Sequence, residues 1–169
     1  MSGPRTEIPP GTPRLNVVLI EPEIPQNTGS VGRLCMATGS ALHLVKPLGF
    51  SIDAQALKRA GLDYWEHLQV HIHESSDDFF TSLSPDARIH LVETRAGQTL
   101  YDVSYQSGDY VIFGKETTGL ADWILDRHAE ALIRIPMYDA RVRSLNLSNA
   151  VSIAVYEAIR QIERLGPRP

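Results

Sequence analysis

Short apolar runs rich in β-branched residues recur along the chain and alternate with segments of helical periodicity. Six runs predict buried strands, at residues 15–20, 41–45, 70–72, 89–92, 110–113 and 131–135. Strands that alternate with helices are typical of α/β proteins with a parallel sheet. The sequence therefore predicts an α/β fold with a mainly parallel sheet flanked by helices.

Helices are predicted between the strands and after the last one, at residues 28–38, 54–60, 75–83, 121–127 and 146–165. Asp53 is a candidate cap for the second of these helices, and Gly61 follows its end. The last helix carries an apolar stripe wider than the roughly 100° of an ordinary surface helix. Such a helix either lies in the centre of the core or packs partly against a second subunit, and the pattern favours neither.

Length and composition predict a single domain. Residues 1–13 contain four prolines and no apolar periodicity, which predicts a flexible N-terminal extension before one domain at 14–169. No apolar run approaches the roughly 18–20 residues that span a bilayer, and no secretory signal is present. Cys35 is the single cysteine, so an internal disulfide is excluded. These features predict a cytoplasmic protein.

The charge balance disfavours indiscriminate binding of polyanions. The chain has 16 Lys and Arg against 20 Asp and Glu, a net charge of −4, whereas a basic footprint dominates non-specific nucleic-acid binding. A local cationic site remains compatible with this balance.

Ligands of open parallel sheets bind at the carboxyl ends of the strands, and three loops there are unusual. In the first, Asn27 or Thr28 is predicted to cap a helix whose free N–H groups favour an anion such as a phosphate. Gly29 permits close backbone approach, and Arg33 can turn toward the same region. A capped helix with a solvated arginine explains this pattern equally well.

The second and third loops follow the strands at 110–113 and 131–135. Gly114 allows close approach to a ligand, and Glu116 can bind a ligand or a neighbouring arginine. The Walker order GxxxxGK[ST] and the GxGxxG motif are both absent. The third loop offers more cap candidates than one helix needs, and Arg141 and Arg143 make it cationic; the candidates are Ser144, Asn146 and Ser148. A glycine-bounded turn and a polar helix start are the simpler alternatives.

Other signals for chemistry are weaker. His71 and His73 share one face of a predicted strand, but no third metal ligand stands at suitable spacing. The GxSxG motif of a serine nucleophile is absent. Cys35 lies on an apolar stripe, which predicts a core residue and not a nucleophile.

Taken together and in order, segments 27–33, 113–120 and 135–151 resemble the three motifs of the SPOUT family of RNA methyltransferases. Segments 15–29, 59–64 and 104–110 further resemble the minimal subfamily that methylates the ribose 2′-hydroxyl of C or U at position 34 of tRNA. The resemblance covers about residues 15–165. Lys115 and Thr118 stand where this subfamily often has proline and arginine, and the loop at 137–143 is about one residue longer.

The resemblance implies a C-terminal deep trefoil knot, S-adenosylmethionine as cofactor and no metal. It also implies a homodimer whose active site draws on both subunits. The cofactor would be held by Val92, Thr94, Gly114, Glu116, Ile135, Met137, Ser144, Leu145 and Asn149.

The resemblance further implies catalytic roles for Arg33, Asn27, Glu116, Ser144 and Asn146. Because arginine has a pKa above about 12, Arg33 is a poor base by itself and would mainly orient the hydroxyl and a phosphate. RNA-binding roles fall on Arg33, Lys46, Arg59, Arg141 and Arg143. Together with Lys58, the last four are expected on one face of the dimer.

The expected function is therefore S-adenosylmethionine-dependent 2′-O-methylation of the wobble nucleotide of tRNA. One alternative is a 2′-O-methyltransferase for another RNA site. The other is a non-catalytic RNA-binding dimer that retains the knotted fold.

Overall fold

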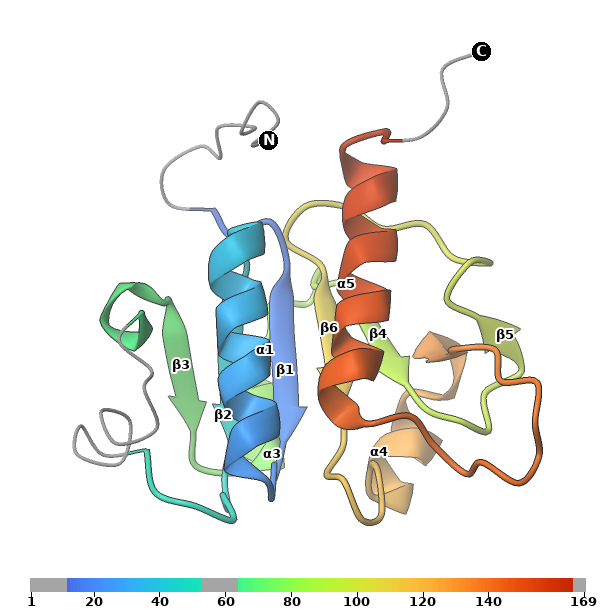
Figure 1. Ribbon diagram of the computed structural model, residues 1–169, viewed down its shortest axis with the longest axis horizontal. Coiled ribbons are helices and arrows are strands. Elements are labelled where there is room, and N and C mark those ends of the chain that lie inside the picture. Colours follow the sequence, from blue (N-terminus) through green and yellow to red (C-terminus); the bar gives the residue numbers. More distant parts are fainter. Residues whose placement is uncertain (1–11, 53–63, 166–169) are drawn as a thin grey trace.

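The structure is a computed structural model that describes residues 12–52 and 64–165. Its centre is a sheet of seven strands in the order β3-β2-β1-β6-β4-β7-β5, and each pair of neighbouring strands is parallel (Figure 1). The strands are β1 (Asn16–Ile20), β2 (Ala41–Val45), β3 (Val70–His73), β4 (Ile89–Val92), β5 (Gln98–Thr99), β6 (Tyr110–Phe113) and β7 (Leu132–Arg134).

All six predicted strands are confirmed, each within one residue at either end. The prediction missed β5, which has two polar residues and pairs only with the edge of β7. Two short 3-10 helices, η1 (Trp65–His67) and η2 (Ala129–Ala131), were also missed. Elements this short lack the repeated apolar positions on which periodicity depends.

Helices cover both faces of the sheet. On one face, α1 (Pro25–Thr38) and α5 (Leu147–Ile162) pack side by side (Figure 1). On the other face, α3 (Ser76–Ser82) and α4 (Asp122–Arg127) pack on a second apolar cluster. The helix predicted at 54–60, like residues 1–11 of the predicted extension, lies outside the described residues.

An apolar cluster lies on each face of the sheet, and the side chains of β1 alternate between the two clusters. Val17 and Leu19 pack in the cluster under α1 and α5, whereas Val18 and Ile20 pack in the cluster under α3 and α4. All four are buried, as expected for a strand whose alternate residues point to opposite faces of a covered sheet.

The long C-terminal helix α5 lies on a face of the sheet, and its apolar stripe packs in the larger of the two core clusters. Val151, Val155 and Ile159 are buried, whereas Ile153 is 38% and Tyr156 56% exposed. The predicted stripe therefore packs mainly on the core of this chain, and Ile153 and Tyr156 lie outside it on the exposed side of the helix. Packing of α5 against a second subunit stays a prediction. No helix within the described ranges is long and apolar enough to cross a membrane.

Candidate active site

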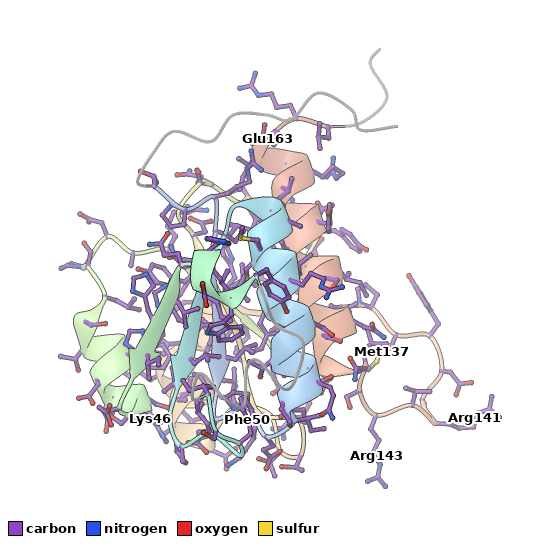
Figure 2. The ribbon with its side chains drawn as sticks, turned by 60° about the vertical axis from the view of Figure 1, so that its left-hand side comes forward. Lys46, Phe50, Met137, Arg141, Arg143 and Glu163 are labelled. Carbon is purple, nitrogen blue, oxygen red and sulfur yellow. The ribbon has the colours of Figure 1, made fainter. Side chains whose placement is uncertain are left out.

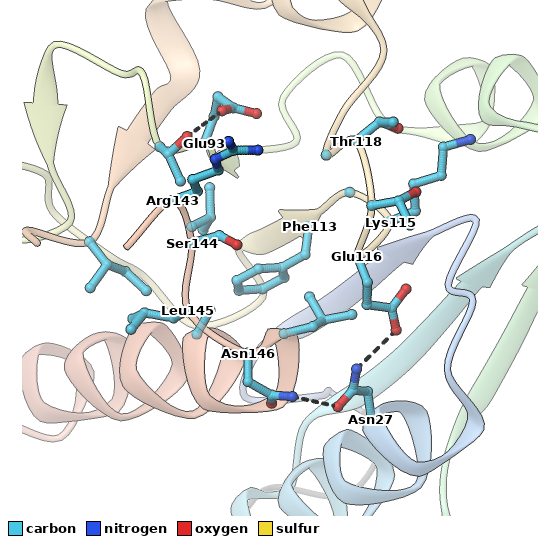
Figure 3. Close-up of a pocket in the computed structure, with 18 of the residues that line it drawn as sticks. Asn27, Glu93, Phe113, Lys115, Glu116, Thr118, Arg143, Ser144, Leu145 and Asn146 are labelled. Carbon is cyan, nitrogen blue, oxygen red and sulfur yellow. Dashed lines mark hydrogen bonds between the residues drawn. The ribbon is translucent and has the colours of Figure 1, made fainter. Parts of the chain in front are cut away.

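Four loops meet at the edge of the sheet where β1, β4, β6 and β7 end. They enclose a pocket of about 510 Å³ (Figure 3), within the range of roughly 300–1,000 Å³ typical of small-ligand sites. Its lining combines apolar side chains with carboxylate, amide and hydroxyl groups, including Asn27, Val92, Glu93, Thr94, Phe113, Gly114, Glu116, Ile135, Met137, Arg143, Ser144, Leu145 and Asn146. The three loops singled out in the sequence therefore form a single site.

Most of the predicted site residues line this pocket. Of the nine residues expected to hold the cofactor, eight line it, and Asn149 on α5 does not. Of the five expected catalytic residues, four line it, and Arg33 does not. The loop at 93–95 also contributes Glu93, which the sequence interpretation missed because no motif marks it.

A chain of side-chain hydrogen bonds links the three loops (Figure 3). The Asn146 Nδ2 atom donates to Asn27 Oδ1 at 3.0 Å, and Asn27 Nδ2 donates to Glu116 Oε1 at 3.1 Å. Asn27 is buried. Asn146 also caps α5, because its Oδ1 accepts hydrogen bonds from the backbone N–H groups of Ser148 and Asn149.

The prediction that Asn27 or Thr28 caps the first helix is wrong. The helix begins at Pro25, and its N-cap is Ile24, whose side chain makes no cap hydrogen bond. Proline fits the first helical position because its ring fixes φ and it has no N–H to satisfy. The earlier start places Asn27 inside the helix, where its side chain turns into the pocket.

The anion at the start of α1 belongs to the protein itself. The Glu116 carboxylate accepts hydrogen bonds from the backbone N–H groups of Glu23 at 2.8 Å and Ile24 at 3.1 Å. Burial acts to raise the pKa of Glu116, but these bonds and the Asn27 amide outweigh it and lower the pKa below its usual value. An ionised carboxylate thus stands where the sequence favoured a phosphate.

Two further contacts join the loop after β1 to the loop after β6. The Glu23 carboxylate accepts hydrogen bonds from the Thr117 N–H at 3.1 Å and the Thr117 hydroxyl at 2.9 Å. Lys115 pairs with Glu21 at 2.8 Å, and this bond raises the pKa of Lys115. The sequence marked Lys115 as a departure from the subfamily pattern but did not indicate its partner, which lies 94 positions away.

Gly114 permits a close backbone approach, but what approaches it is the backbone of its own loop and not a ligand. A Cβ atom at this position would lie 2.1 Å from the carbonyl carbon of Gly119 and 2.3 Å from the Leu120 nitrogen. Gly119 itself has φ of 71°. The loop therefore turns back sharply on itself at the pocket wall.

Of the predicted RNA-binding residues that the structure describes, Lys46 follows β2, Arg141 and Arg143 lie on the loop after β7, and Arg33 lies within α1. The Arg33 guanidinium lies over the Tyr64 ring, 5.3 Å from its centroid. Lys46 pairs with Glu74 at 2.8 Å, and Arg143 lines the pocket. Figure 2 shows Lys46 and Arg143 toward the same end of the molecule. Arg59 and Lys58 lie outside the described residues.

The two weaker signals for chemistry, the histidine pair and the single cysteine, lie among residues of the fold and not in the pocket. His71 and His73 both stack on His43, and within 12–52 and 64–165 no group of three His, Cys, Asp or Glu residues is placed to hold a metal ion. Cys35 is buried, as predicted for a core residue, and burial raises the pKa of its thiol to about 12. Such a thiol is a poor nucleophile at neutral pH.

Known proteins resemble this chain over most of its length. The chain is 51% identical over 153 residues to a tRNA (cytidine(34)-2′-O)-methyltransferase of Yersinia pestis, covering 88% of this chain and 94% of the relative. A solved structure presented as structural insights into the 2-OH methylation of C/U34 on tRNA matches with a TM-score of 0.81 and 46% identity, over 87% of this chain and 95% of that one.

A solved structure of lower sequence identity has a similar fold. An AdoMet-bound rRNA methyltransferase from Sinorhizobium meliloti matches with a TM-score of 0.76 and 26% identity, over 90% of this chain and 58% of that one. The family model described as SpoU rRNA methylase matches residues 14–156. With three sequence motifs meeting in one pocket and this match over most of its length, the chain belongs to the SpoU rRNA methylase family.

Proposed function

We propose that this protein is an S-adenosylmethionine-dependent methyltransferase that modifies the ribose 2′-hydroxyl of C or U at position 34 of tRNA. One observation carries the proposal. A chain about half identical to a tRNA (cytidine(34)-2′-O)-methyltransferase, over nearly the whole of that relative, brings all three motif loops together in one pocket. Such a protein would act in the cytoplasm, where tRNA is matured.

The pocket suits S-adenosylmethionine by its chemistry. Apolar walls from Val92, Ile135 and Leu145 suit the adenine ring, beside the polar groups of Thr94 and Ser144 and the backbone of Gly114 and Met137. The Glu93 side chain is only 11% exposed and lines the same pocket. A mostly covered carboxylate suits a cofactor that carries sulfonium and ammonium charges. When bound, this cofactor supplies an electrophilic methyl group.

With the cofactor bound, the ribose 2′-oxygen would take up the methyl carbon, and the carbon–sulfur bond would be the one that breaks. The chain must align these atoms, and the hydroxyl proton needs an acceptor. We assign alignment to Ser144 and Asn146 at the pocket wall. Asn27 and Glu116 hold Asn146 through the hydrogen-bonded chain described above.

Arg33 is assigned to orient the RNA. A guanidinium is a cation with five N–H donors, so it can hold a phosphate and the hydroxyl but cannot by itself accept the proton. A neighbouring RNA phosphate oxygen takes the proton. Since Arg33 does not line the pocket of its own chain, we place its action in an active site shared between subunits.

Exposed apolar side chains support a homodimer. Met36 on α1 is 43% exposed, and Ile153 and Tyr156 on the adjacent helix α5 are 38% and 56% exposed. Large apolar side chains exposed on two adjacent helices are a feature of interaction sites. We propose that α1 and α5 pack against a second copy of this chain.

A trefoil knot in the C-terminal part of the chain completes the proposed fold. Its support is the family relationship and the meeting of loops 114–119 and 135–147 at one pocket. Their crossing would give the cofactor a wall of backbone from two segments far apart in the sequence.

The test is transfer of labelled methyl groups from S-adenosylmethionine to tRNA that lacks 2′-O-methylation at position 34. Mass spectrometry of nuclease fragments locates the label. We expect label on the ribose of nucleotide 34, lost with Arg33→Ala and kept with Arg127→Ala, an exposed arginine on α4. Label on another tRNA position or on rRNA refutes the assignment to position 34. Cofactor binding without transfer to any RNA favours the non-catalytic dimer.

A further inference from the structure

The loop from Met137 to Arg143, here named the rim loop, connects two walls of the pocket. Ile135 lines the pocket before the loop, Met137 and Arg143 line it at the two ends of the loop, and Ser144 to Leu147 line it afterwards. Figure 2 shows Met137, Arg141 and Arg143 on this loop, which extends away from the sheet and its helices. Anything held on the rim loop therefore lies beside the pocket mouth.

Asp139 gives the rim loop a defined shape. Its carboxylate accepts a hydrogen bond from the Arg141 N–H at 3.0 Å and one from the Arg141 Nε at 2.9 Å. Its backbone carbonyl accepts a hydrogen bond from the Val142 N–H at 3.1 Å. The side-chain bond from Arg141 lowers the pKa of Asp139. The loop is thus a closed turn that presents its neighbours in fixed directions.

Tyr138 is the side chain that this turn presents. It is 97% exposed, compared with 58% for Tyr101 and 56% for Tyr156. Among the described residues, no hydrogen bond or ring contact involves Tyr138. A tyrosine ring carries a large apolar surface whose burial is favourable, so a ring left this open is available to a binding partner.

The charges around Tyr138 favour an anionic partner. Arg143 makes no ion pair within the described residues and faces the pocket, and Arg141 remains 90% exposed beside its carboxylate partner. The one carboxylate of the rim loop, Asp139, is already bound by Arg141. An aromatic ring flanked by arginines is the pattern by which proteins hold single-stranded nucleic acid, since the ring stacks on a base while cations contact phosphates.

We propose that Tyr138 stacks on an unpaired base of the RNA substrate adjacent to the methylated nucleotide, while Arg143 contacts the intervening phosphate. The inference rests on the proposed function, because it assumes that the RNA enters the pocket at nucleotide 34. Bases beside this nucleotide belong to the anticodon loop and are unpaired, so a stacking platform can reach them. The rim loop is then a determinant of RNA affinity that touches neither the methyl group nor the hydroxyl.

Steady-state kinetics with unmodified tRNA test this role. Loss of a stacked base typically costs 1–3 kcal/mol, so Tyr138→Ala should raise the KM for tRNA by about 5- to 150-fold with little change in kcat. Tyr138→Phe keeps the ring and should stay near wild type. Tyr101→Ala, which removes an exposed tyrosine outside the pocket lining, should also stay near wild type. The affinity for S-adenosylmethionine should be equal in all four proteins.

A second readout does not depend on turnover. An anticodon stem-loop RNA with 2-aminopurine on either side of nucleotide 34 reports stacking by fluorescence. We expect binding of wild type and of Tyr138→Phe to alter the emission at one of the two positions, and this change to disappear with Tyr138→Ala.

Three outcomes overturn the inference. The first is an unchanged KM and unchanged fluorescence in Tyr138→Ala. The second is a change of oligomeric state in Tyr138→Ala by light scattering, which would make the rim loop a subunit contact. The third is the absence of RNA binding by the wild type. If the wild type methylates a different nucleotide, the proposed function fails, and the same comparison on that RNA still decides the role of Tyr138.

Discussion

The carboxylate of Glu116 accepts hydrogen bonds from the backbone N–H groups of Glu23 and Ile24 and from the Asn27 amide. Three donors thus converge on two oxygen atoms at the junction of two loops. Donors aimed at a carboxylate in a partly buried place stabilise its charged form. This one residue therefore replaces a side-chain cap for α1 and at the same time orients Asn27 toward Asn146.

Replacing Glu116 by Gln removes one acceptor and introduces an NH₂ group facing N–H donors. We expect the free energy of unfolding to fall by about 1–3 kcal/mol, the usual cost of leaving such a group unpaired, and methyl transfer to fall with it. Urea denaturation and initial rates measure both. Glu74→Gln breaks an exposed ion pair and should cost less than about 1 kcal/mol. Equal effects of the two substitutions would contradict the role given to Glu116.

A second residue-scale feature is the buried imidazole of His43. The Asn16 Nδ2 donates to the Gly108 carbonyl, so its Oδ1 is free to accept from His43 Nε2 at 3.1 Å. The His43 Nδ1 then accepts from His73 Nε2 at 3.0 Å. This assignment keeps His43 neutral, and burial followed by repulsion from His71 and His73 lowers its pKa to about 3.

The lowered pKa of His43 predicts a loss of stability in acid. Between its ordinary pKa of 6.5 and the folded value near 3, the unfolded chain binds a proton at His43 that the folded chain does not. The contribution of neutral His43 to the free energy of unfolding is therefore complete above pH 6.5. It declines as pH falls, by up to about 1.4 kcal/mol per pH unit. In His43→Gln this part of the dependence of the unfolding free energy on pH should vanish. NMR of labelled histidines should show His43 neutral down to pH 4, and protonation near pH 6 would refute the prediction.

At the scale of elements, the turn from Gly114 to Leu120 forms a pocket wall because it folds back on its own backbone. An added methyl group at Gly114 would meet backbone atoms, which cannot rotate away as a side chain can. The strand β6 ends directly before this turn. A shift of the backbone at Gly114 would therefore move the pocket wall and displace Glu116.

Gly114→Ala should therefore destabilise the fold by roughly 1–3 kcal/mol, the usual range for overpacking, and weaken binding of S-adenosylmethionine. Calorimetric titration measures the binding, and thermal denaturation measures the stability. Gly97→Ala is the matched control, because an added Cβ there meets no atom within 4 Å. The same affinity in both variants would show that the turn tolerates a shift of its backbone.

At the scale of the whole molecule, α1 and α5 form one outer layer with apolar side chains facing outward, whereas Arg33 stands outside the pocket of its own chain. The proposed homodimer would account for both features. Burial of the apolar surface would drive association, and the partner's pocket would gain an arginine.

Ile153→Asp should disrupt this dimer. An unpaired charge at a buried interface costs about 3–5 kcal/mol, so light scattering should show a monomer, and methyl transfer should be lost. Ile72→Asp is the control, because Ile72 is also exposed, at 47%, but lies on the edge strand β3. A dimer in Ile153→Asp with wild-type mass would place the subunit interface elsewhere.

The local sequence determined the strands and most of the helices of this protein, because buried strands need uninterrupted apolar runs and α5 needs its periodic stripe. It also determined which loops form the site, since parallel strands all end at one edge. The sequence offered Ser144, Asn146 and Ser148 as caps of α5, and the structure selects Asn146, whose side chain accepts from neighbours two and three residues away.

Only the tertiary structure decided what depends on partners far apart in the chain. The start of α1 at Pro25 depends on a carboxylate 92 positions from Ile24, and Lys115 finds Glu21 across 94 positions. Likewise, the two-residue strand β5 exists because β7 offers it an edge. Periodicity describes which face of an element is buried, whereas hydrogen bonds between loops arise only once the sheet has brought those loops together.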